Sequence, residues 1–302
     1  MRQKENQAVP ESYPKGFGIE WHTKRSFGLG GHEFNTLEDG NDYFSTKDPE
    51  QEGRLLMAKS SIIIHQLMAL VREQKPKNIV ELGIYRGGSA AFLYLLAKPM
   101  KMLALDLSKN RLEKLDHFIA VEKAQDILRV EYGVDQSDST RVRALTGEHL
   151  GAGRTIDLVL DDASHILGPT RSSFETLFPY IRPGGSYIVE DYASAHLVGS
   201  LFLKDAVNGS ESAQNIFRAG MKGCTDEDLL PCHILAVEAM LAAMVDQGIV
   251  RKVVANKQWL RIIRGHKDIE NPQEFNIRAL ACDHFGLLNC VPDDNVLRVL
   301  GS

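Results

Sequence analysis

Residues 78–89 read NIVELGIYRGGS, a short apolar run that passes into a turn rich in glycine. The length and the Ile, Val and Leu content of the run are typical of a strand buried in a parallel sheet. Gly83, Gly87 and Gly88 allow the backbone of the turn to approach a ligand without a clashing Cβ. In doubly wound folds, nucleotide-like ligands bind at such a first strand–helix turn. The stretch therefore predicts a ligand site at the start of an α/β domain.

The residue types in this turn indicate the kind of ligand. The spacing is not the G-x-G-x-x-G of a dinucleotide site, because Glu81 precedes the first glycine by two residues and a G-x-x-x-G step follows. An acid that faces the turn suits a ligand with a cationic amine and a sulfonium better than it suits a diphosphate. The candidate cofactor-binding residues of the turn are Glu81, Gly83, Tyr85, Arg86, Gly87 and Ser89.

Strands and helices alternate on the C-terminal side of this turn. Apolar, β-rich runs at 101–106, 127–132, 156–162 and 185–189 alternate with helical patterns at 109–124, 140–145 and 172–180, and a further helix is expected over 52–74. This alternation predicts an α/β fold with a doubly wound, mostly parallel sheet that has helices on both faces. The β-rich stretches 250–254 and 259–263 are separated by only four residues, which allows a hairpin and excludes a helical crossover. The sheet is therefore expected to end with an antiparallel strand.

The regions outside this alternation have other patterns. Residues 1–50 mix glycines with aromatic residues and lack periodicity, which predicts a loop-rich arm or lid rather than a domain with its own core. Residues 51–265 form the expected cofactor-binding domain, with a helical insertion at about 198–248 that contains helices over 201–221 and 229–247. Residues 266–302 are expected to be a tail with one short helix.

Composition narrows the classes of partner. The formal net charge of −5 and the lack of a basic block give no electrostatic case for nucleic acid or an anionic membrane. No stretch approaches roughly eighteen consecutive apolar residues, and the N-terminus lacks the apolar core of a signal peptide. The four cysteines lack the CxxC spacing of a zinc site. We expect a cytoplasmic protein, with homo-oligomerisation possible through the N-terminal arm.

Two later strands end in paired acids, Asp161-Asp162 and Glu190-Asp191. Neighbouring parallel strands end at the same edge of a sheet, so these carboxylates are expected to converge. Carboxylates that are this close repel one another unless a cation or shared protons compensate. An all-oxygen ligand set favours Mg²⁺, with Mn²⁺ or Ca²⁺ as substitutes. His165, three residues after Asp162, has the side chain best suited to act as a general base near neutral pH.

Further candidate cofactor-binding residues follow the other strands. Asp106 ends the second strand, where an acid can accept hydrogen bonds from ribose hydroxyls. Asp135 and Gln136 come just after the third strand and can contact an adenine edge. Asp161 can either cap a turn or contact the methionine portion of a cofactor, and both interpretations stay open.

In their order along the chain, these motifs resemble the class I S-adenosylmethionine-dependent methyltransferases over roughly residues 75–265. The segment Asp162-x-x-His165, followed by Glu190-Asp191, is similar to the metal-dependent sugar O-methyltransferases of macrolide and rhamnosyl natural-product biosynthesis. The resemblance implies a seven-stranded sheet with one reversed strand near its end. It also implies Mg²⁺ held by Asp162, Glu190 and Asp191, with His165 as the base. A small-molecule acceptor with a vicinal diol is favoured, because an ion on two adjacent hydroxyls would align the methyl transfer.

Two other functions stay open. His165, His196 and a carboxylate would make a two-histidine iron site, which would indicate a metal-dependent hydroxylase on the same scaffold. A methyltransferase-like binding protein would keep the cofactor pocket without turnover, although the complete set of acids with a histidine argues against it. A nicotinamide dehydrogenase is disfavoured by the missing G-x-G-x-x-G.

Overall fold

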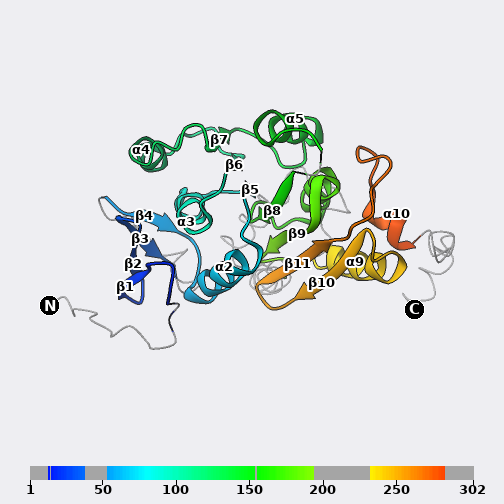
Figure 1. Ribbon diagram of the computed structural model, residues 1–302, viewed down its shortest axis with the longest axis horizontal. Helices are drawn as coiled ribbons and strands as arrows, with labels where there is room; N and C mark the ends of the chain where they lie inside the picture. Colours follow the sequence, from blue (N-terminus) through cyan, green and yellow to red (C-terminus); the bar gives the residue numbers. More distant parts are fainter. Residues whose placement is uncertain (1–12, 14, 38–52, 154, 194–231, 283–302) are drawn as a thin grey trace, which may run out of the picture. The chain divides into compact units, whose positions relative to one another are not determined.

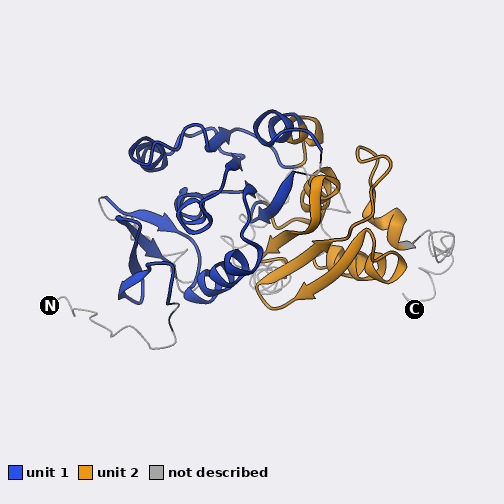
Figure 2. Ribbon diagram, viewed as in Figure 1, with its two compact units in different colours: residues 1–136, 144–163 blue, residues 137–143, 164–302 orange. Residues whose placement is uncertain are grey.

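The computed structural model describes residues 13, 15–37, 53–153, 155–193 and 232–282 (Figure 1). The chain divides into two compact units (Figure 2). Unit 1 comprises residues 1–136 and 144–163, and unit 2 comprises residues 137–143 and 164–302. One of the boundaries along the chain therefore falls directly after Ala163, between the first pair of acids and His165.

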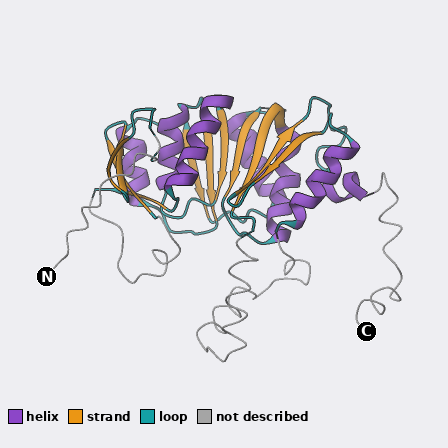
Figure 3. Ribbon diagram, turned by 90° about the horizontal axis from the view of Figure 1, so that it is seen from below, coloured by secondary structure: helices purple, strands orange, loops and turns teal. Residues whose placement is uncertain are grey.

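Unit 1 contributes four strands to a seven-stranded sheet with the order β10-β11-β9-β8-β5-β6-β7 (Figure 1, Figure 3). These strands are β5 Asn78–Leu82, β6 Lys101–Asp106, β7 Leu128–Tyr132 and β8 Ile156–Asp161. Strand β5 pairs in parallel with β6 and β8, and β6 pairs in parallel with β7. Every residue of β8 is buried, as expected of a strand with helices on both faces of its sheet. The predicted doubly wound, mostly parallel sheet is confirmed.

Unit 2 contributes the other three strands, which are β9 Ile181–Glu190, β10 Val250–Ala255 and β11 Trp259–Arg264. Strand β11 pairs antiparallel with both β9 and β10. The predicted hairpin is thereby confirmed, and β11 is the one reversed strand. The end of β11 is fixed by Arg264, whose fully buried guanidinium donates to the carbonyl oxygens of Gly248 and Ile249.

Helices connect these strands. Those of unit 1 are α2 Ser61–Gln74, α3 Gly88–Ala97 and α4 Glu113–Val121. Those of unit 2 are α6 Leu167–Leu177, the 3₁₀ helix η1 Phe178–Tyr180, α9 Ile234–Val245 and α10 Ile277–Cys282. Helix α5 Ser139–Leu150 begins in unit 2 and ends in unit 1. Helix α5 is longer than predicted because Leu150 is buried as well as Leu145. The predicted helix over 201–221 lies outside the described residues. No helix in the described part of the chain is long and apolar enough to cross a membrane.

The N-terminal segment is not the loop-rich arm that the sequence predicted. With residues 55–57, its described part forms a four-stranded sheet of β1 Glu20–Thr23, β2 Ser26–Leu29, β3 His32–Thr36 and β4 Leu55–Met57, in that order. The β2–β3 hairpin closes through Gly30 and Gly31, which both have the positive φ that a type I′ turn requires. Phe27 and Phe34 are fully buried and stack with ring centroids 5.0 Å apart. Phe27 and Phe34 are therefore part of a packed core, whereas Phe17 of the same segment is 40% exposed.

Several predicted boundaries also differ from the structure, and two of them have a clear cause. The helix expected over 52–74 begins only at Ser61, because residues 55–57 pair in parallel with β3. Ser60 then starts the helix by accepting a hydrogen bond from the backbone N–H of Ile63. The Pro-Gly-Gly turn expected before the fifth strand lies within β9, which begins at Ile181. Proline is tolerated there because the ladder with β11 starts only at Ser186.

Candidate active site

The glycine-rich turn after β5 approaches other backbone segments very closely. A Cβ on Gly83 would lie 2.4 Å from the carbonyl oxygen of Asp162, and a Cβ on Gly88 would lie 2.2 Å from that of Leu56. Gly87 caps the N-terminus of α3 with a φ of 81°. These glycines are therefore required for the packing of the turn itself, in addition to any approach of a ligand.

Asp106, at the end of β6, fixes the conformation of this turn. Its Oδ2 accepts hydrogen bonds from the backbone N–H groups of Ile84 at 3.0 Å and Tyr85 at 3.2 Å, and its Oδ1 accepts from Ser108 at 2.7 Å. A carboxylate oxygen has more than one lone pair, so ribose hydroxyls can still bind there. Tyr85 has a φ of 49° and is 55% exposed, with the Arg86 guanidinium 5.7 Å from its ring centroid.

Glu81 is a fully buried acid immediately before the turn. Burial raises the pKa of its carboxyl group to about 7, against the opposing effects of the Lys59 ammonium and the buried Ser89 hydroxyl. The carboxylates of Asp162 and Asp106 raise the same pKa further. A cationic amine bound beside Glu81 would favour its ionised form.

This pKa predicts how the stability of the metal-free protein depends on pH. The pKa of Glu81 is near its ordinary value of 4.5 in the unfolded chain and about 7 in the folded protein, so the folded state binds more protons between these values. The stability that this group contributes is therefore fully present below the unfolded pKa and is lost as the pH rises through the folded pKa, by up to about 3 kcal/mol. Glu81→Gln should remove this loss. Denaturant unfolding in EDTA at several pH values measures it, and parallel pH profiles for both proteins would contradict the raised pKa.

The residues predicted to contact adenine differ in their placement. Asp135 is exposed, whereas Gln136 is buried and its side-chain nitrogen lies 3.4 Å from Oδ2 of Asp161. Asp161 is buried at the end of β8, and its Oδ1 accepts from the backbone N–H of Ala163 at 3.4 Å. Asp161 thus makes the contact of a turn cap, and its role toward a cofactor stays a prediction.

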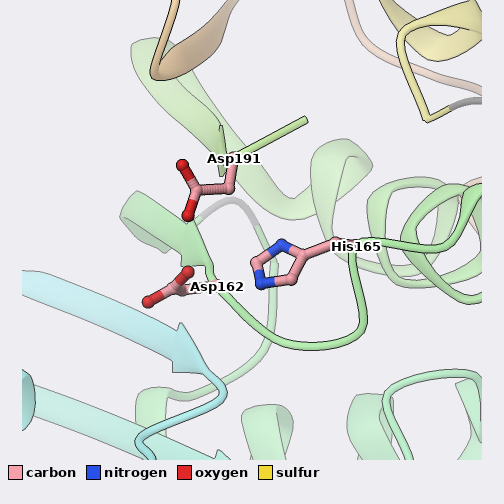
Figure 4. Close-up of side chains that lie close together, drawn as sticks. All are labelled: Asp162, His165 and Asp191. Atoms are coloured by element: carbon pink, nitrogen blue, oxygen red, sulfur yellow. The ribbon is translucent and has the colours of Figure 1, made fainter. Parts of the chain in front are cut away.

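Three of the residues predicted for catalysis and metal binding lie together. One ligand atom from each of Asp162, His165 and Asp191 lies within 4.8 Å of the other two, and the side chains converge (Figure 4). Glu190, predicted as a further metal ligand, is not part of this group. It is 1% exposed and pairs in register with Trp259 of β11.

The backbone is unusual at two members of this group. His165 has a φ of 55° and Asp191 a φ of 48°. This left-handed conformation costs a residue with a side chain about 1–2 kcal/mol, and such strain is concentrated at functional sites. Asp191 is held in place through its backbone N–H, which donates to the carbonyl oxygen of Gln258 at 2.8 Å.

Two histidines of the N-terminal sheet have acidic partners in unit 1. Nε2 of His22 lies 3.2 Å from Glu33, and Nε2 of His32 lies 2.7 Å from Glu122. His196, which the hydroxylase alternative requires, lies outside the described residues. The described residues therefore leave the two-histidine iron site untested.

Lys59 is a residue of this region that sequence reasoning missed. Its side chain is 1% exposed, and its ammonium nitrogen lies 2.9 Å from Oδ2 of Asp162. It follows β4 by two residues and precedes the Ser60 cap of α2. The one signal in the sequence is that this lysine directly follows the apolar run LLMA. The contact itself could not be predicted, because it depends on how distant segments pair.

The side chains of this region fit the groups that the sequence predicted. Carboxylate oxygens from Asp162 and Asp191 are ligands that Mg²⁺ accepts, together with several waters. The His165 imidazole in the same group can act as a proton acceptor or as a further ligand. The turn held by Asp106 directly follows the buried Glu81 and lies at the first strand–helix connection, where doubly wound folds bind nucleotide-like cofactors.

Comparisons with known proteins show which family the middle of the chain resembles. Residues 80–192 match a family described as a methyltransferase domain. The chain is 32% identical over 138 residues to 8-demethyl-8-(2-methoxy-alpha-L-rhamnosyl)-tetracenomycin-C 3'-O-methyltransferase of Streptomyces olivaceus. The aligned segment covers 43% of this chain and 31% of that relative. It is 37% identical over 82 residues to mycinamicin VI 2''-O-methyltransferase of Micromonospora griseorubida, which covers 22% and 21% of the two chains.

The matched segment is similar to a methyltransferase domain, and the predicted resemblance to sugar O-methyltransferases is confirmed. This chain spans 31% and 21% of the lengths of the two relatives. Among solved structures, it is similar to MycE methyltransferase from the mycinamycin biosynthetic pathway in complex with Mg, SAH and mycinamycin VI. That similarity has a TM-score of 0.46 at 19% identity and covers 68% of this chain and 49% of the other.

Proposed function

We propose that the protein is an S-adenosylmethionine-dependent O-methyltransferase that requires Mg²⁺ and methylates a hydroxyl of a sugar or another vicinal diol in secondary metabolism. The observation that carries the proposal is the group of Asp162, His165 and Asp191, which combines oxygen ligands for a hard cation with a histidine. The names of the relatives, a 3'-O- and a 2''-O-methyltransferase, support a hydroxyl acceptor, and the rhamnosyl group in the first name supports a sugar.

In this proposal the side chains hold an ion, orient the acceptor and move a proton. Asp162 and Asp191 would hold the ion, with Glu190 as a predicted third ligand that lies outside the observed group, and His165 takes the proton of the acceptor hydroxyl on a ring nitrogen. Proton transfer to a positioned base contributes about 10²–10⁴ in rate. When bound, Mg²⁺ supplies Lewis acidity at the hydroxyl oxygen, and S-adenosylmethionine supplies an electrophilic methyl group.

The cofactor residues have separate tasks in the same proposal. Glu81 faces the amine of the cofactor, Asp106 accepts from its ribose, and Asp135 and Gln136 lie toward its adenine. The contacts of Asp106 with the turn support this assignment, because they place its carboxylate at the carboxyl end of β6.

Methyl transfer is expected to stop in EDTA and to return with Mg²⁺, because the acceptor hydroxyl is a poor nucleophile without a Lewis acid. The assay follows the methyl group of S-adenosylmethionine into a rhamnosylated tetracenomycin acceptor. Activity that resists EDTA would contradict the metal requirement. Oxygen-dependent hydroxylation that only Fe²⁺ restores would favour the hydroxylase alternative.

Calorimetry separates the remaining alternative classes without an acceptor. S-adenosylhomocysteine is expected to bind and NAD is not, because the turn lacks the dinucleotide spacing. Binding of NAD in preference to S-adenosylhomocysteine would overturn the cofactor assignment. Tight binding of S-adenosylhomocysteine without turnover of any diol would favour the non-catalytic binding protein.

A further inference from the structure

Lys59 is a buried cation that contacts one of the proposed metal ligands. Its ammonium nitrogen lies 2.9 Å from Oδ2 of Asp162, and its side chain is 1% exposed whereas that of Asp162 is 22% exposed. Lysine is almost never fully buried unless it is paired, because moving an ammonium out of water costs several kcal/mol. The burial of Lys59 therefore indicates that the surrounding acids need its charge.

A second acid in the same unit also interacts with Lys59. Glu81 is 0% exposed, and the positive charge of Lys59 lowers the pKa of its carboxyl group, against the effect of burial. The carboxylates of Asp162 and Asp106 act on Glu81 in the opposite sense. Lys59 thus interacts with an acid of the cofactor turn and with an acid of the proposed metal site, and both interactions lie within unit 1.

We propose that Lys59 is the internal counter-cation of this acid cluster and supplies its positive charge when no metal is bound. The inference rests on the proposed function, in which Asp162 is a metal ligand. Lys59 contacts Oδ2 of Asp162, so the same carboxylate would be shared between the ammonium group and an ion. Two positive groups on one carboxylate repel each other, so Lys59 also limits how tightly the site holds Mg²⁺.

Lys59 and Mg²⁺ can then partly replace each other, because each supplies positive charge to the same acids. Without Lys59, the metal-free protein keeps buried negative charge that lacks its main compensation and loses stability. An added divalent ion then supplies the missing charge and recovers a large part of that stability by mass action. Replacing a lysine that only fills space would also lower stability, but by the same amount with and without the metal.

The test compares the unfolding midpoints of wild type and Lys59→Met in EDTA and in saturating Mg²⁺, at matched ionic strength. We expect a lower midpoint for Lys59→Met in EDTA and a larger increase with Mg²⁺ than wild type shows. Calorimetric titration with Mg²⁺ is expected to give at least about tenfold tighter binding to Lys59→Met, since a neighbouring positive charge has been removed. Equal Mg²⁺-induced increases, or weaker Mg²⁺ binding by the variant, would overturn the proposal.

Two matched variants separate charge from packing. Lys59→Arg keeps the positive charge, so its Mg²⁺ affinity and its Mg²⁺-induced increase in midpoint are expected to match those of wild type, although the larger guanidinium lowers both midpoints. Arg171→Met breaks another buried ion pair, in which Arg171 lies 2.8 Å from Glu238 in unit 2. It is expected to lose stability by the same amount with and without Mg²⁺. A metal-dependent loss in Arg171→Met would show that the Mg²⁺ effect is not specific to Lys59.

Failure of the proposed function is distinguishable from failure of this inference. If wild type binds no Mg²⁺, the metal requirement fails, and a double-mutant cycle in EDTA still tests Lys59. Asp162→Asn removes a charge that Lys59 compensates, so Lys59→Met should cost less stability in that background. An equal cost in both backgrounds would refute the counter-cation role. The double variant also supplies a folded reference should Lys59→Met alone not fold without metal.

Discussion

Replacing His165 by alanine is expected to lower kcat for methyl transfer by about 10²–10⁴-fold and to leave the affinity for S-adenosylhomocysteine nearly unchanged. His165 belongs to the group with Asp162 and Asp191, where an imidazole can take the proton of an acceptor hydroxyl. The two carboxylates remain in the variant, so Mg²⁺ binding should persist. Single-turnover kinetics measure the chemical step, and calorimetry measures both affinities.

His266→Ala is the matched control, because His266 is an exposed histidine just after β11 and is not in the group. It should keep wild-type kinetics. The rate of His165→Ala is expected to rise with pH, since hydroxide can partly replace the missing base. A variant that loses S-adenosylhomocysteine affinity instead of kcat would contradict the base assignment. Loss of Mg²⁺ binding would identify His165 as a metal ligand.

Gly83→Ala is expected to lower the free energy of unfolding by more than about 3 kcal/mol and to abolish binding of S-adenosylhomocysteine. The new Cβ would lie 2.4 Å from the carbonyl oxygen of Asp162, and the backbone N–H of Asp162 is itself bonded to Leu82. The clash is with backbone, so no side-chain rotation relieves it, and either the turn or the end of β8 must move. Denaturant unfolding and calorimetry measure the two losses.

Gly31→Ala separates this clash from backbone strain. Gly31 has a φ of 84° and Gly83 a φ of 79°, but a Cβ on Gly31 would have nothing within 4 Å. In this variant only the positive φ lowers the free energy of unfolding, by about 1–2 kcal/mol. It should also retain cofactor binding. Equal losses in the two variants would mean that strain, and not the contact with Asp162, makes glycine necessary at position 83.

The sheet and the positions of the acids could be predicted because both follow from local patterns. A strand buried on both faces is a continuous apolar run, and β8 has this pattern up to Asp161. The reversed strand β11 follows from a gap that is too short for a helical crossover. Asp162 and Asp191 could be placed because each comes directly after such a strand.

Features that depend on pairing between distant segments could not be predicted. Leu55 and Leu56 share helical spacing with residues further along, yet they pair with β3, because a strand edge offers backbone groups that need partners. The contact between Lys59 and Asp162 spans 103 positions and follows from that pairing. Glu190 is buried at the end of β9, where it pairs with Trp259 of β11. The burial of a residue at a strand end depends on such distant partners, so the sequence does not indicate it.

The hairpin β10–β11 has a consequence for where this protein can be divided. The segment that matches the methyltransferase family ends at residue 192, whereas the strand that pairs with Glu190 and holds Asp191 through Gln258 begins at Trp259. At the other end, Gly88 packs on the backbone of Leu56, which lies before the matched segment. A fragment trimmed to 80–192 would expose one edge of β9 and lose the support of its acids. A fragment that keeps these contacts must therefore be longer than the segment that the family model matches.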